Sequence, residues 1–330
     1  MRRRDFVTLL GGAAAAWPLA ARAQQPEPMR RIGVLMAFNE NDPEPQAWLS
    51  GFMQGLAELG WTYGRNLRMD VRWSAGDVER MRMFAKTLVD LQPDVILANS
   101  TPVTALLQRE TRTIPIVFVA VTDPVGANFV ASLPRPGGNI TGFGDAETAM
   151  VGKWLELLKE ITPGIKRIAA MFNPDTAAGG GSYFLPPLEA GAQLLKVELI
   201  TARVHNDAEI EQVITSLGGE PGGLIVVPDG FMVVHRAPII SLAARYNVPA
   251  VYWQSLFAKD GGLLSYGADY SDLFRRAAPY VDRILRGTKP SDLPVQLPVK
   301  FKMAINAKTA KVLGIEVPPQ LLAQADEVIE

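Results

Sequence analysis

The sequence predicts an α/β protein built from two Rossmann-like lobes, each a parallel sheet flanked by helices. Beyond residue 30, short β-rich apolar runs alternate with amphipathic helical patterns, which is typical of parallel α/β architecture. The second half of the chain repeats the strand pattern of the first. Further elements follow the second run, so we expect the chain to recross between the lobes in a multi-crossing hinge.

The first run predicts four strands that alternate with helices in the order βαβαβαβ. Residues 32–38 form a buried strand, and apolar residues at i, i+3, i+4 and i+7 then indicate a helix that ends at Gly60. Residues 67–73, 95–98 and 114–121 are the next expected strands, and a second helical stripe (Met81, Phe84, Ala85 and Leu88) ends before Pro93. Right-handed crossovers place these strands in one parallel sheet.

The second run begins near Arg167 and echoes the first at nearly one offset. Residues 31–36, 95–97 and 114–118 are echoed by residues 167–172, 224–226 and 248–252, at offsets of 136, 129 and 134. Any single echo could be chance, because buried parallel strands look alike, but the common order indicates two similar lobes.

The glycine-rich segment 137–142 is the predicted junction between the lobes. After the second run we expect a strand at 263–267, a helix to Gly287 and a last strand at 299–305. The first lobe is therefore predicted to comprise residues 30–141 plus about 268–291, and the second 142–267 plus about 292–330. Thr141, Gly142 and Gly267 are the predicted hinge residues.

Residues 1–25 are predicted to be an export signal. Arg2, Arg3 and Arg4 precede an apolar stretch from Val7 to Ala21, and an A-x-A cleavage pattern places the cut after about Ala23. The stretch is shorter than the roughly 20 residues that span a bilayer, so a cleaved segment is favoured over an anchor. The paired arginines indicate the twin-arginine route, with general secretion as the alternative. Both routes lead out of the cytoplasm, and a bacterial periplasm is the simplest compartment.

Composition excludes several classes of function. The 330 residues carry 33 basic and 34 acidic side chains, so no surface for nucleic acid is expected. The chain has no cysteine, which excludes thiol nucleophiles, iron–sulfur clusters and disulfides. His205 and His235 do not have the spacing of a metal site, and no nucleophile elbow, P-loop or H-E-x-x-H helix occurs. We therefore expect no metal, no cofactor and no enzymatic activity.

The candidate ligand site lies at the carboxyl ends of the predicted strands, where open α/β sheets bind ligands. The polar segment 99–104 begins a helix and offers hydroxyls and backbone N–H groups to an anion, although simple helix capping would also explain it. Aromatic residues at the strand ends could hold an apolar or planar ligand, or serve only lobe packing. The candidate ligand-binding residues are Phe38, Asn39, Ser100, Thr101, Thr122, Asp123, Asn173, Asp229, Trp253, Gln254 and Tyr266.

Several segments together resemble a known family. They include Thr122-Asp123-Pro124-Val125-Gly126, the segments 135–142 and 261–267, the segment 280–287 and the tail 315–319. The chain from residue 30 to 330 is similar to the substrate-binding proteins of ABC transporters, and more narrowly to the TrpX-like group of tryptophan and tyrosine binders. This resemblance implies a type I periplasmic-binding fold, a ligand in the cleft between two lobes, and delivery to a membrane permease. It also implies that Ser100, Thr101 and Thr122 lie near an amino-acid α-carboxylate, whereas residues 228–231 and 253–254 are variable and leave the ligand open.

We therefore expect a periplasmic solute receptor that binds a small molecule, such as an amino acid or small carboxylate, by hinge closure. The expected partners are this ligand and an ABC permease in the inner membrane, with the receptor itself a monomer. Two alternatives remain: an exported sensor for a chemoreceptor or kinase, and a periplasmic hydrolase on the same scaffold, which would need an activated nucleophile or a metal.

Overall fold

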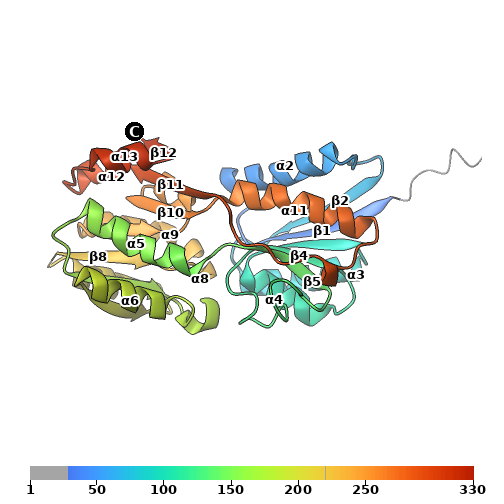
Figure 1. Ribbon diagram of the computed structural model, residues 1–330, viewed down its shortest axis with the longest axis horizontal. Helices are drawn as coiled ribbons and strands as arrows, with labels where there is room; N and C mark the ends of the chain where they lie inside the picture. The colour runs from blue at the N-terminus through green and yellow to red at the C-terminus, as the bar shows by residue number, and fades with distance from the viewer. Residues whose placement is uncertain (1–28, 220) are drawn as a thin grey trace, which may run out of the picture.

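The computed structural model describes residues 29–219 and 221–330, and these form two lobes that lie side by side (Figure 1). The predicted signal peptide and its cleavage site lie outside the described residues. Among the helices of the described ranges, none has the length and apolar character that a membrane span requires.

The first lobe is a five-stranded parallel sheet with the order β2-β1-β3-β4-β5. Its strands are β1 (Arg30–Met36), β2 (Leu67–Trp73), β3 (Val95–Asn99), β4 (Ile116–Val121) and β5 (Ile140–Gly144). The strands other than the edge strand β2 are buried nearly throughout, because helices cover both faces of the sheet. Successive strands are added on one side of β1 (β2) and then on the other (β3, β4, β5), so the strand order reverses between β1 and β3, which is where doubly wound sheets bind ligands.

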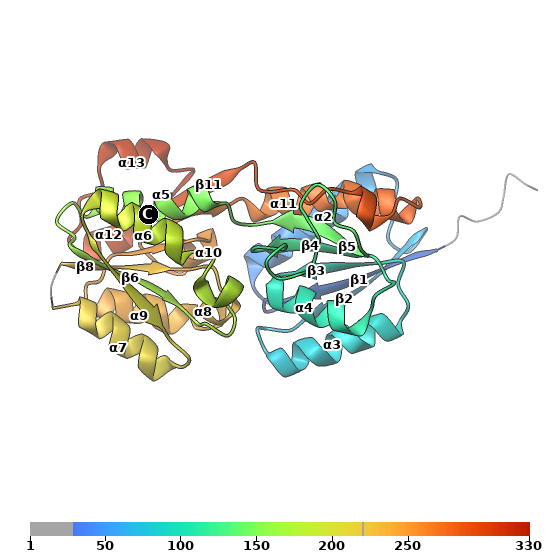
Figure 2. The same ribbon diagram turned by 60° about the horizontal axis from the view of Figure 1, so that its bottom comes forward.

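Helices cover both faces of the first sheet (Figure 2). Helices α2 (Pro43–Glu58) and α11 (Tyr270–Leu285) pack one face with Phe52, Leu56 and Phe274. Helices α3 (Val78–Asp90) and α4 (Thr101–Glu110) pack the other, for example with Leu88 and Leu107. The apolar stripes found in the sequence thus mark the buried faces of α2 and α3, although Met53 of the α2 stripe is exposed.

The second lobe is a seven-stranded sheet with the order β12-β11-β10-β9-β8-β6-β7. Its strands are β6 (Arg167–Phe172), β7 (Glu198–Arg203), β8 (Gly222–Val226), β9 (Ala250–Tyr252), β10 (Leu264–Ala268), β11 (Phe301–Asn306) and β12 (Glu327–Ile329). All pair in parallel except β10 with β11, because the chain re-enters this lobe from the hinge and runs β11 back along β10.

The remaining helices belong to the second lobe and bury one large core cluster with its sheet. They are α5 (Thr148–Ile161), α6 (Leu185–Leu195), α7 (Asp207–Leu217), α8 (Gly230–Val234), α9 (Arg236–Arg245), α10 (Ser255–Lys259), α12 (Ala307–Val312) and α13 (Pro319–Gln324). Two short 3₁₀ turns, η2 (Ala178–Gly181) and η3 (Pro290–Asp292), complete the described elements. The repeat seen in the sequence is confirmed, since β7-β6-β8-β9-β10 has the same order as β2-β1-β3-β4-β5.

Three segments connect the lobes. Residues 145–147 lead from β5 to α5, Asp269 joins β10 to α11, and residues 298–300 lead back into β11. The last two segments are tied together, because the Asp269 N–H donates to the Lys300 carbonyl (2.9 Å) and the Asp269 carboxylate pairs with Lys302 (3.1 Å). The crossings thus fall a few residues later than the boundaries predicted at 141/142 and 291/292, because β5 and residues 293–297 both pack on the first lobe.

The predicted hinge residues lie inside strands, next to the crossings. Thr141 is buried in β5 and donates its hydroxyl to the Leu293 carbonyl (2.5 Å). A Cβ on Gly142 would lie 2.0 Å from the Phe118 carbonyl oxygen, and one on Gly267 would lie 1.7 Å from that of Trp253. Both glycines are therefore needed for close approach of neighbouring strands, a role that sequence reasoning assigned instead to flexibility.

Candidate functional site

A cleft lies between the two lobes, at the carboxyl ends of both sheets. It holds about 180 Å³ open to small molecules and is lined by segments that follow β1, β3, β4 and β5 of the first lobe and β6, β8 and β9 of the second. Seven of the predicted ligand-binding residues line it: Phe38, Ser100, Thr101, Thr122, Asp229, Trp253 and Gln254.

The start of α4 forms a polar wall of the cleft. Ser100 occupies the N-cap position, yet its hydroxyl makes no capping bond and is buried without a hydrogen-bond partner. Beside it, Asn99 is fully buried, and its Oδ1 accepts from the Ala37 N–H (3.3 Å). This bond fixes the orientation of the amide and leaves Nδ2 as a buried donor without a partner. Simple helix capping therefore does not explain Ser100.

The backbone around this wall is held in sparsely populated conformations. Ser100 has φ 87° and Ala120 has φ 62°, and the pairing of β4 with β5 is irregular between Val119 and Val121. Each such residue costs of order 1–3 kcal/mol and persists only where the surrounding structure enforces it. Both residues line the cleft. Thr101 helps to fix the geometry, because its hydroxyl accepts from the Thr122 N–H (3.2 Å).

Asp145 is the first buried acid of the cleft. Its two carboxylate oxygens accept from the hydroxyls of Thr122 (2.8 Å) and Tyr270 (2.9 Å). Burial raises the pKa of this carboxyl, and the two hydrogen bonds oppose the shift only in part. The pKa of Tyr270 is raised as well, by burial and by the negative charge of Asp145.

The raised pKa of Asp145 gives a testable pH dependence. A carboxyl whose pKa is higher in the folded than in the unfolded state contributes stability below its unfolded pKa, and this contribution is lost as the pH rises through the folded pKa. Asp145→Asn removes the ionisation; its amide oxygen can accept from one of the two hydroxyls, and its NH₂ can donate to the oxygen of the other. We therefore expect this variant to gain stability over wild type as the pH rises from 4 to 8. Urea unfolding of both proteins measures the difference, and a difference that does not vary with pH would contradict the raised pKa.

Asp229 is the second buried acid, on the opposite lobe. Its carboxylate accepts from the Asn173 N–H (2.6 Å), the Phe231 N–H (2.7 Å) and the hydroxyl of Thr176. Burial raises the pKa of Asp229, while these hydrogen bonds oppose the shift. The carboxylate orders the loops after β6 and β8 at the point where they face the first lobe.

The rest of the lining is largely apolar. Phe38 and Trp253 are both buried, and Trp253 packs against Phe257 with ring centroids 4.8 Å apart. Phe231 stacks on His235 at 3.8 Å. Gln254 is 2% exposed, and its Oε1 has no hydrogen-bond partner. A ligand here meets flat apolar walls with isolated polar groups between them.

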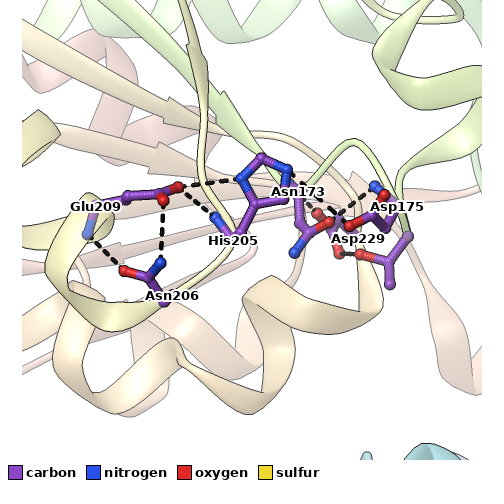
Figure 3. A network of polar contacts seen from close by, with 7 residues as sticks. Asn173, Asp175, His205, Asn206, Glu209 and Asp229 are labelled. Atoms are coloured by element: carbon purple, nitrogen blue, oxygen red, sulfur yellow. Dashed lines mark hydrogen bonds and ion pairs between the residues drawn. The ribbon is translucent and has the colours of Figure 1, made fainter.

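Four predicted ligand-binding residues do not line the cleft. Asn39 is exposed and its side chain accepts from the Asn41 N–H, and Asp123 accepts from the Gly126 N–H in a turn. Tyr266 stacks on Phe301 within the second lobe. Asn173 is buried, and its Oδ1 accepts from the Asp175 N–H (2.8 Å) (Figure 3). It therefore shapes the loop after β6, which donates hydrogen bonds to Asp229 in the loop after β8.

Figure 3 also shows His205, which does not itself line the cleft and contacts Glu209 (3.1 Å) and Asp175 (4.0 Å). Within residues 29–219 and 221–330, no three His, Asp or Glu side chains are grouped so that they could hold a metal ion.

Sequence reasoning missed Asp145, Thr176 and Tyr270, and also the lining residues Val78 and Met81 of α3 and Val233 and Val234 of α8. Asp145 and Tyr270 stand at two of the lobe crossings, so an exact crossing position could have indicated them. Asn99 was part of the polar segment noted before α4, but it was not singled out. For Met81 and Val234, the sequence shows only that the side chains are apolar, which does not distinguish a residue of the cleft from a residue of the core.

The lobes touch each other directly around the cleft. A Cβ on Gly76 of the first lobe would lie 2.1 Å from Cγ2 of Val234 in the second. Arg236 and Ser255 of the second lobe contact Asp42 (3.2 Å) and Glu44 (2.7 Å) of the first. The structure therefore has its lobes closed on each other.

Comparisons with known proteins agree with this geometry. The family model for ABC transporter substrate binding proteins matches residues 32–329. A tyrosine-binding protein from Clostridioides difficile is 31% identical over 267 residues, which is 81% of this chain and 76% of that protein.

Two solved structures also align along most of the chain. An ABC domain from Streptococcus pneumoniae in complex with L-Trp has a TM-score of 0.82 at 28% identity, over 91% of this chain and 100% of that one. A ligand-free, open substrate-binding protein from Clostridium difficile has a TM-score of 0.69 at 27% identity, over 91% and 99%. The higher score against the ligand-bound structure agrees with the closed lobes seen here.

Proposed function

The chain belongs to the ABC transporter substrate-binding proteins, and from this we propose that its cleft binds an α-amino acid with an aromatic or large apolar side chain. We further propose that the protein works in the periplasm and delivers this ligand to an ABC permease in the inner membrane. The proposed ligand class agrees with the tyrosine and L-Trp named for two relatives.

The observation that carries the proposal is the pair of unpartnered donors at the start of α4. Asn99 Nδ2 and the Ser100 hydroxyl are buried in the cleft wall without acceptors, which costs free energy unless a ligand supplies them. The helix N-terminus adds partial positive charge at the same place. Together these groups favour a ligand carboxylate.

The charges of the cleft favour a zwitterion over a simple acid. Its described lining contains Asp145 and Asp229 but no lysine or arginine. An aromatic carboxylic acid would bring a net negative charge towards two buried acids, whereas an amino acid also brings an ammonium group that they attract. The free Oε1 of Gln254 is a further acceptor for that group.

The apolar walls fit the side chain of such a ligand. Phe38 and Trp253 lie on opposite lobes, so an apolar side chain between them is contacted from both sides only when the lobes are closed. Ligand contacts with both lobes favour the closed form by differential affinity. The three crossings, rather than the strand interiors, are the segments that would rotate.

The test is binding of L-tryptophan and L-tyrosine by isothermal titration, with indole-3-propionate as the matched acid that lacks the amino group. We expect both amino acids to bind at micromolar concentrations or below and the acid to bind much more weakly. Small-angle scattering should show a smaller radius of gyration with saturating L-tryptophan. Equal affinity for the acid would contradict the zwitterion preference, and no binding of either amino acid would contradict the ligand class.

A further inference from the structure

A group of charged residues joins the two lobes outside the cleft. Asp42 and Glu44 at the start of α2 belong to the first lobe, and Arg236, Ser255 and Lys259 at the starts and ends of α9 and α10 belong to the second. None of these five residues lines the cleft. We call them the interlobe clamp.

The contacts of the clamp are direct. Arg236 bridges Asp42 of the first lobe (3.2 Å) and Asp260 of its own lobe (2.7 Å). Glu44 Oε1 accepts from the Ser255 hydroxyl (2.7 Å) and lies 3.4 Å from Lys259 Nζ. The carboxylates of Asp42 and Glu44 are only 18% and 15% exposed. Water therefore screens these contacts less than it screens an open surface pair.

The local chemistry of α2 supports a role across the lobes. Asp42 is the N-cap residue of α2, where an aspartate usually accepts from the first N–H groups of its own helix. Here its side chain makes no such bond and reaches Arg236 instead. Ser255, in the first turn of α10, likewise donates to Glu44 of the other lobe. Asp42 thus makes no local capping bond, and both side chains bond a residue of the other lobe.

We propose that this clamp is an affinity-determining site remote from the ligand, which acts by stabilising the closed form. Opening the lobes breaks the contacts of Asp42 and Glu44, whereas the Arg236–Asp260 pair lies within one lobe and survives. A ligand that binds the closed form has an apparent Kd equal to its intrinsic Kd divided by the closed fraction. The clamp thus raises affinity without touching the ligand, whichever ligand the cleft accepts.

The test is the double variant Asp42→Asn/Glu44→Gln. The matched control is Glu79→Gln/Asp90→Asn, which removes the same charge from two exposed carboxylates paired within α3. We expect the clamp variant to bind L-tryptophan about 10-fold more weakly and the control to bind as wild type does. Raising NaCl from about 50 to about 500 mM should weaken wild type and control but not the clamp variant, because salt screens the clamp charges.

A second measurement needs no ligand. The chain has no cysteine, so Tyr63→Cys and Leu194→Cys, at exposed positions on separate lobes, allow two dyes to report the distance between the lobes. The ligand-free clamp variant should populate closed molecules less than the control does. If the clamp variant and the control have equal Kd values and equal salt responses, the proposal is wrong. If wild type does not bind L-tryptophan, the proposed ligand class is wrong, and the distance measurement then tests the clamp by itself. Equal distance distributions in the clamp variant and the control would overturn the clamp in that case.

Discussion

Asn99→Asp is expected to weaken binding of an amino-acid ligand about 100-fold, which corresponds to roughly 2.7 kcal/mol. The substitution keeps the size of the side chain and the acceptor for the Ala37 N–H, but it replaces the buried donor Nδ2 with a carboxylate oxygen. The ligand carboxylate then loses a charge-assisted hydrogen bond and meets a like charge. Titration calorimetry with L-tryptophan at pH 8 measures the loss.

Ser100→Ala and Ser265→Ala form a matched pair for the same wall. Both hydroxyls are buried without a partner, but Ser100 lines the cleft and Ser265 lies in β10 outside it. We expect Ser100→Ala to weaken binding about 10-fold and Ser265→Ala to leave it unchanged. Unchanged affinity in both Asn99→Asp and Ser100→Ala would place the ligand carboxylate elsewhere in the cleft.

Gly267→Ala is expected to lower the free energy of unfolding by about 3 kcal/mol. The added Cβ would lie 1.7 Å from the carbonyl oxygen and 2.8 Å from the carbonyl carbon of Trp253. These are backbone atoms of the segment that follows β9, so no side-chain rotation relieves the overlap. Because Trp253 lines the cleft, any shift of this segment should also weaken ligand binding.

Gly152→Ala is the control for that experiment, and we expect it to raise the free energy of unfolding rather than lower it. Gly152 lies inside α5 with open space at its Cβ position and with φ outside the left-handed region. Alanine there should stabilise the protein by about 0.5–1 kcal/mol. Urea unfolding compares the two variants. A Gly267→Ala protein as stable as wild type would contradict the role of Gly267 in close packing.

The fold could be predicted from the sequence because its periodic signals are local. Apolar residues at helical spacing in α2, α3 and α11, and buried β-rich runs such as β1 and β3, are each readable within a short window. The similar order of these signals in both halves then indicated two lobes. Parallel strands with short connections leave few alternative topologies, so the local signals were enough to determine the architecture.

The sequence determined the side of the sheets on which the site lies, since ligands bind at the carboxyl ends of parallel strands. Ser100, Thr122, Asp229 and Trp253 were located by that rule alone, and they line the cleft. The same rule also selected Asn39 and Asp123, whose side chains hold turns within their own loops. A strand end places a residue near the cleft, but the loop conformation decides whether its side chain faces it.

Only the tertiary structure decided which residues meet across the lobes. Asp145, Thr122 and Tyr270 lie far apart along the chain and come together because two crossings and one strand end converge beside the cleft. The clamp of Asp42, Glu44, Arg236, Ser255 and Lys259 depends likewise on how the lobes close. Whether a glycine bends or allows close packing was decided by its neighbours, as for Gly142 and Gly267. The physical reason is that such contacts depend on distances set by the packing of whole lobes, which no local pattern of residues encodes.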